Sequence, residues 1–145
     1  MSQENVATVR RVYTTMNLSV PGSVSQLRAP LESWRALIDP DIEWCGPREF
    51  PDLAEPVFGH EGIVAYAAKI AEALDDYRMM PEQFIDASDR QVLVFSREGG
   101  RGKGSGVEVE THPTAHLWTL RDGLAIRMQS YWEREDALKA VGLEE

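Results

Sequence analysis

The chain has 145 residues, 43% hydrophobic and 27% charged, an ordinary balance for one globular domain spanning residues 1–145. A formal net charge of −9 is unlike the basic footprint of proteins that bind nucleic acids or anionic membranes, so we expect neither partner. No apolar leader or membrane-length run is visible, which predicts a cytoplasmic location.

The first part of the chain is predicted to be helical. A helix beginning at Ser2 places apolar residues at helical spacing, and a second begins at Pro30, after a loop over residues 18–29, and ends before Asp39. A third helix is expected over residues 60–75, with an apolar face formed by Ile63, Tyr66, Ala67, Ile70 and Leu74.

Strands dominate the remainder. A short strand is expected over residues 41–45, followed by an irregular segment, 46–59, whose three prolines exclude regular structure. Further strands are expected over residues 77–87 and 91–97. Residues 98–106, EGGRGKGSG, are predicted to form a flexible hairpin tip. A phosphate-binding loop is the alternative, and it is disfavoured because the glycines lack the required spacing.

The most informative stretch is residues 107–132. Two alternating arms meet at Asp122-Gly123, a strong signal for a β-hairpin. One face of this hairpin carries a histidine, two tryptophans, a methionine and a serine, a mixture that suits the wall of a small-molecule pocket: His116, Trp118, Met128, Ser130 and Trp132. A last helix is expected over residues 133–141, ended by Gly142.

Helices followed by meandering strands indicate an α+β domain. Four stretches in order also resemble the SnoaL-like family of the nuclear transport factor two and ketosteroid isomerase superfamily: LIDPDIEW at 37–44, GHEGI at 59–63, HLWTLRDG at 116–123, and YWERE leading into AL at 131–138. The resemblance implies a cone-shaped α+β barrel, in which a strongly bent, mostly antiparallel sheet wraps around three N-terminal helices. It also implies a homodimer joined through the outer sheet surface.

The known mechanisms of these relatives do not carry over by position. His116 stands where ketosteroid isomerases have an acid, and Gly46 falls where their base lies. Their tyrosine donor falls near Val12, one step from Tyr13. Ser130 occupies the place of the aspartate of SnoaL-type cyclases and does not titrate near neutral pH. The resemblance therefore implies the fold without a mechanism.

The candidate site rests on His116, since histidine can transfer protons near neutral pH. We expect His116 to donate or accept a proton, with Ser130 and Tyr66 as hydrogen-bonding helpers, although no carboxylate partner is evident and a buried structural histidine is the alternative. The predicted apolar wall consists of Trp44, Phe58, Trp118, Met128 and Trp132.

Three functions fit these residues. The first is a cofactor-free isomerase, cyclase or dehydratase acting on a small apolar carbonyl or polycyclic compound. The second is a binding module for a small hydrophobic ligand, and the third is a dimeric scaffold whose cavity is filled by its own side chains. No metal is expected, because the histidines are scattered and Cys45 is the single cysteine.

Overall fold

The computed structural model describes residues 2–16, 34–102 and 108–143. Its helical elements are α1 (Ser2–Met16), the short 3-10 helix η2 (Trp34–Leu37), α2 (Pro51–Ala54), α3 (Gly59–Ala73) and α4 (Arg134–Ala140). Its strands are β1 (Ile38–Cys45), β2 (Val57–Phe58), β3 (Leu74–Ser88), β4 (Gln91–Gly102), β5 (Glu108–Arg121) and β6 (Leu124–Tyr131).

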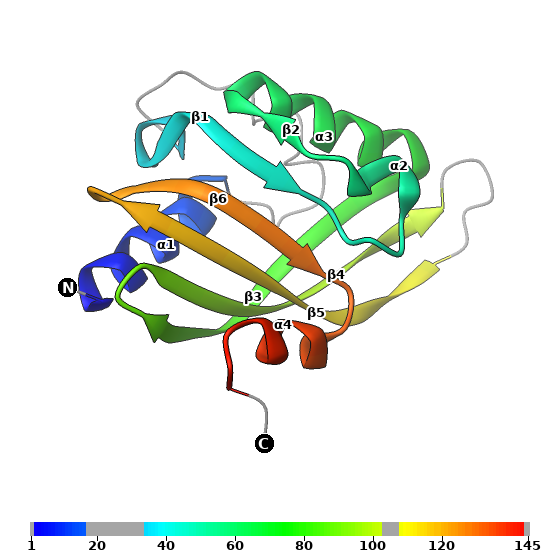
Figure 1. Ribbon diagram of the computed structural model, residues 1–145. Coiled ribbons are helices and arrows are strands. Elements are labelled where there is room, and N and C mark those ends of the chain that lie inside the picture. The colour runs from blue at the N-terminus through cyan, green and yellow to red at the C-terminus, as the bar shows by residue number, and fades with distance from the viewer. Residues whose placement is uncertain (1, 17–33, 103–107, 144–145) are drawn as a thin grey trace.

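The six strands form one curved, open sheet in the order β2-β1-β6-β5-β4-β3 (Figure 1). Neighbouring strands are antiparallel except β1 and β6, which run parallel. This mixed sheet with helices packed on it is the cone-shaped α+β architecture that the sequence predicts.

The main core fills the space between the inner face of the sheet and helices α1 and α3. Val9, Val12 and Met16 of α1 and Ile63 of α3 are buried there against β-strand side chains such as Trp118. A smaller cluster lies on the outer face, where α4 covers Leu93, Ala115 and Leu117 with Ala137 (Figure 1). Strand β5 is therefore buried on both faces, with His116 and Trp118 on the face toward α1.

The β5–β6 hairpin confirms the sequence prediction in detail. Asp122 (φ 53°) and Gly123 (φ 81°) both have positive φ, the requirement of the tight turn that an Asp-Gly pair favours. The register sets His116 opposite Ser130 and Trp118 opposite Met128. Paired residues project to the same face, so these four side chains share the inner surface.

Strand β1 begins earlier than the sequence predicts. Residues 34–37 form a 3-10 turn, and the strand starts at Ile38 and passes through Asp39 and Pro40, where the second helix was expected to end. The proline is tolerated because it lies within the irregularity of the β1–β6 register between Ile38 and Glu43. The rest of the predicted second helix lies outside the described residues.

Strand β4 is longer than predicted, and this difference matters most for function. It continues to Gly102, so Glu98 and the glycines after it lie in a strand and not in a flexible tip. Pairing on both sides supplies the order that their composition lacks: Glu98 pairs with Met79 of β3 and His112 of β5. Residues 103–107 lie outside the described part of the chain.

Within that described part, no helix has both the length and the apolar character needed to cross a membrane.

Candidate functional site

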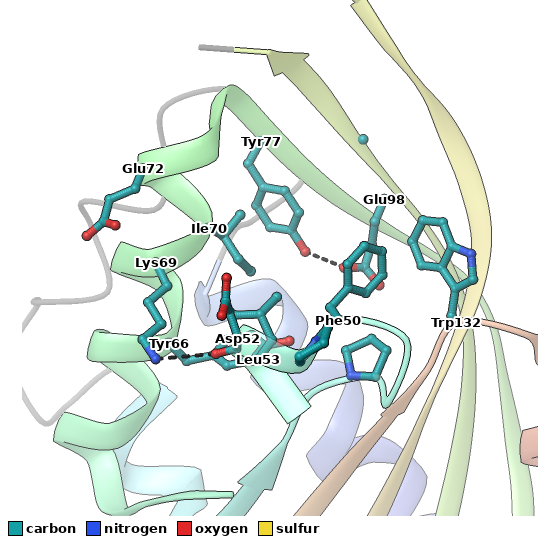
Figure 2. Close-up of a pocket in the computed structure, with 13 residues that line it drawn as sticks. Phe50, Asp52, Leu53, Tyr66, Lys69, Ile70, Glu72, Tyr77, Glu98 and Trp132 are labelled. Carbon is teal, nitrogen blue, oxygen red and sulfur yellow. Dashed lines mark hydrogen bonds between the residues drawn. The ribbon is translucent and has the colours of Figure 1, made fainter. Parts of the chain in front are cut away.

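A cavity of about 990 Å³ opens between α3, the ends of β3 and β4, and the segment that carries α2 (Figure 2). Its wall combines aromatic and aliphatic side chains with charged groups, among them Phe50, Leu53, Tyr66, Lys69, Ile70, Glu72, Tyr77, Glu98 and Trp132. Glu98 and Tyr77 project into it from neighbouring strands and contact one another. This volume is in the range of small-molecule sites.

The segment between β1 and α2 forms one side of this cavity. Gly46 donates its backbone N–H to the Leu53 carbonyl oxygen (3.0 Å), closing a compact loop. Phe50 packs edge-on against Trp132 (ring centroids 4.9 Å), which joins the loop to the end of β6. His112 stacks on the same ring (centroids 3.7 Å apart, 4° between planes). The tryptophan ring is thus fixed in the wall.

Glu98 is the most highly hydrogen-bonded acid in the site. Its Oε2 accepts from Thr114 Oγ1 (2.7 Å) and pairs with His116 Nε2 (2.9 Å). Its Oε1 accepts from the Tyr77 hydroxyl (2.5 Å). The side chain is 19% exposed, so its charge is held in a largely dry environment with three neighbouring groups in place.

These contacts decide the charge of Glu98. Burial opposes ionisation, but the charge interaction with His116 and the hydrogen bonds from His116, Tyr77 and Thr114 outweigh it and lower the pKa of Glu98 to about 2. The carboxylate therefore stays ionised near neutral pH. Burial, followed by the Glu98 charge, raises the pKa of the Tyr66 and Tyr77 hydroxyls, so both retain their protons.

His116 is held from both sides. Its Nδ1 lies 2.7 Å from the Tyr13 hydroxyl of α1, and that hydroxyl accepts a hydrogen bond from Trp118 Nε1 (3.0 Å). A buried chain therefore runs from Trp118 through Tyr13 and His116 to Glu98. Neither ring nitrogen of His116 is left for direct contact with a ligand.

A second, much smaller cavity of about 30 Å³, the inner niche, lies deeper toward the core. Its polar wall residues are Tyr66, Tyr77, Glu98, His116 and Ser130, and apolar side chains such as Trp44 and Met128 complete it. Tyr66, Ile70, Tyr77 and Glu98 line both cavities, which places the niche directly behind the large pocket.

The residues expected from the sequence are divided between these cavities. His116, Ser130, Trp44 and Met128 line the inner niche, Trp132 lines the large pocket, and Tyr66 lines both. Trp118 lines neither and is buried against Tyr13 and Trp44. Phe58 was expected in the wall, but it is 63% exposed and outside both linings, because it lies in the edge strand β2.

Three important residues escaped the sequence analysis. Glu98 was placed in a loop, Tyr77 was treated only as a strand residue, and Tyr13 was named only as a neighbour of the position where ketosteroid isomerases have a tyrosine donor. One signal was available, since Glu98 lies at an even spacing from Val92, Val94 and Ser96 and so continues the inner face of β4. Among the described residues, no group of three His, Cys, Asp or Glu side chains could hold a metal ion.

Solved structures with the same fold cover nearly the whole chain. TerC, crystallised with polyporic acid, is 24% identical, with a TM-score of 0.70 over 96% of this chain and 98% of that one. A candidate SnoaL-like polyketide cyclase from Jannaschia sp. CCS1 is 21% identical, with a TM-score of 0.65 over 99% and 94%.

A protein of ketosteroid isomerase-like fold from Catenulispora acidiphila DSM 44928, in complex with trimethylamine, is 16% identical, with a TM-score of 0.62 over 92% of this chain and 93% of that one. At these identities the likeness establishes the fold alone. A comparison with curated proteins gives no match. The model of the SnoaL-like domain matches residues 9–128, and the chain therefore belongs to the SnoaL-like family.

Proposed function

We propose that the protein is an acid–base enzyme that isomerises, cyclises or dehydrates a small, mainly apolar organic molecule in the large pocket, with no cofactor. The observation that supports this is the buried Glu98–His116 pair on the cavity walls. A carboxylate in contact with His116 is the element that the sequence analysis lacked, and paired titratable groups in a cleft are typical of catalytic sites.

Glu98 is the group that would carry the proton. Its Oε2 is occupied by His116 and Thr114, whereas Oε1 has one donor, Tyr77. In an isomerisation, Glu98 takes a proton from a carbon next to the substrate carbonyl, the C–H electron pair forms an enolate, and the proton returns to another carbon. His116, with both nitrogens engaged, then acts as a positioning residue and not as the group that donates or accepts the proton.

Hydroxyl groups near Glu98 would support the developing negative charge. Tyr66 lines both cavities and keeps its proton, because its pKa is raised, so it can donate a hydrogen bond to an enolate oxygen. Ser130 offers a second hydroxyl from the niche. Relatives crystallised with polyporic acid and with trimethylamine indicate that this fold accommodates small molecules of different kinds.

The test begins with a ligand screen by thermal shift, since preferential binding to the folded state raises Tm. On a substrate found this way, Glu98→Gln should lower kcat by about 10²–10⁴-fold, the usual contribution of a general base. Glu61→Gln, an exposed carboxylate outside both cavities, is the matched control. Full turnover by the Glu98 variant would exclude the proposed role.

A non-catalytic binding module is the second candidate. The observation in its favour is the low pKa of Glu98, about 2, because a carboxylate so well stabilised is a weak base. Recovery of a screened ligand unchanged after long incubation would support this alternative. A scaffold with a filled cavity fits less well, since about 990 Å³ stays open between the elements. The homodimer and the cytoplasmic location stay predictions, the first testable by sedimentation.

A further inference from the structure

The inner niche matches one kind of chemical group. We propose that it binds the hydroxyl group of an alcohol, phenol or enol whose apolar body lies in the large pocket, with that hydroxyl donating to Glu98 and accepting from Ser130. This inference rests on the proposed small-molecule function and specifies which group of the ligand lies in the niche.

The niche is small. Its volume of about 30 Å³ admits a group the size of a water molecule, which needs about 10–15 Å³ of such space. It adjoins the large pocket along a wall that includes Tyr66, Tyr77 and Glu98. A flat ligand in the pocket can therefore place a small substituent such as a hydroxyl in the niche.

Ser130 provides a hydroxyl that has no hydrogen-bond partner among the described residues. Its side chain is 4% exposed and lines the niche from β6, directly opposite His116 in the register. Its hydroxyl makes no hydrogen bond to any residue in the described ranges. Buried hydroxyls are nearly always hydrogen-bonded, because leaving one unpaired costs free energy. Ser130 is therefore available to donate to an oxygen in the niche.

Glu98 provides an acceptor at the same place. A carboxylate oxygen accepts about two hydrogen bonds, and Oε1 has one, from Tyr77. Because its pKa is about 2, Glu98 can only accept near neutral pH. A group between Ser130 and Glu98 must both accept and donate. A hydroxyl group does both. A carbonyl oxygen can only accept, and the negative charge of Glu98 repels an anion.

Three probes with the same bicyclic body separate these cases: 2-naphthol, 2-methylnaphthalene and 2-naphthoate, whose affinities are measured by calorimetry on the full chain. We expect 2-naphthol to bind about fivefold or more tightly than 2-methylnaphthalene, the effect of one or two net hydrogen bonds, and 2-naphthoate to bind most weakly. A crystal structure with 2-naphthol should place its oxygen within about 3.2 Å of Ser130 Oγ.

Ser130→Ala should remove most of the preference for 2-naphthol and leave the affinity for 2-methylnaphthalene unchanged. Ser96→Ala is the matched control, because Ser96 is a buried serine of the same sheet that lines neither cavity. Equal affinity for the two neutral probes, an equal loss for both in the Ser130 variant, or no binding of any probe would overturn the proposal. None of these results depends on turnover, so the loss of kcat in Glu98→Gln tests the catalytic proposal separately.

Discussion

The buried chain of hydrogen bonds holds the His116 ring at both of its nitrogens. The Trp118 Nε1–H can only donate, so the Tyr13 oxygen accepts from it. The Tyr13 hydroxyl lies 2.7 Å from Nδ1 of His116, and the other ring nitrogen, Nε2, lies 2.9 Å from Glu98 Oε2. Tyr13 thus orients His116 for Glu98.

This chain of hydrogen bonds predicts that removing one atom, the Tyr13 hydroxyl oxygen, has a large effect on stability. Tyr13→Phe should lower the free energy of unfolding by about 1–3 kcal/mol, because it leaves Trp118 Nε1 and His116 Nδ1 buried without a partner. Urea denaturation measures the change. Tyr131→Phe, which removes a half-buried hydroxyl outside both cavities, should change stability by less than about 0.5 kcal/mol. Equal effects of the two variants would contradict the role given to Tyr13.

At the scale of elements, the loop before α2 depends on one close approach. A Cβ on Gly46 would collide with the carbonyl oxygen of Leu53, the same oxygen that accepts the Gly46 N–H. No side chain at this position is compatible with the compact loop, so glycine is required by contact with the backbone. Through Phe50 and Leu53, the loop supplies one side of the large pocket.

Gly46→Ala should therefore open the pocket wall. We expect a several-fold loss of affinity for 2-naphthol and faster amide hydrogen exchange over residues 47–53, because the loop must move to admit a methyl group. Gly142→Ala is the control: its φ of 72° makes alanine cost about 1 kcal/mol, but nothing lies near the new Cβ and the site is distant. Equal loss of binding in both variants would mean that general destabilisation is the cause.

Elements that are specified by a local sequence pattern were predictable, whereas elements that form only by pairing with a distant strand were not. The Asp122-Gly123 turn and the alternation around it identify the β5–β6 hairpin without knowledge of the rest of the chain. Glu98 and the glycines after it have a composition typical of a loop, and only pairing with β3 and β5 makes them a strand. Sequence patterns cannot show such pairing, because the partners are distant in the chain.

At the scale of the whole molecule, the hydrogen-bonded group around Glu98 exists because the fold gathers residues from four elements. Tyr13 comes from α1, Tyr77 from β3, Glu98 from β4 and His116 from β5. Placing His116 on the inner face was possible from alternation alone, and the structure agrees. Alternation also puts Glu98 on that face, but it does not show the contact, because the Glu98 side chain reaches His116 along the sheet, past Thr114, and not across one pair of facing residues.

The same contacts predict how the stability of the folded chain depends on pH. Glu98 has a folded pKa of about 2 against an ordinary value of 4.5, so its contribution to stability is fully present above about pH 4.5 and is lost as pH falls toward 2. The difference in unfolding free energy between wild type and Glu98→Gln should therefore shrink, by an amount on the order of 2–3 kcal/mol, between about pH 6 and the lowest pH at which both fold. Urea titrations across this range measure this difference.

The control is Glu61→Gln, whose carboxylate is 77% exposed and which should stay within about 0.5 kcal/mol of wild type at neutral pH. A wild-type advantage over Glu98→Gln that stayed constant with pH would show that Glu98 acts through its shape and not through its charge, which would weaken the case for a stabilised carboxylate in the pocket.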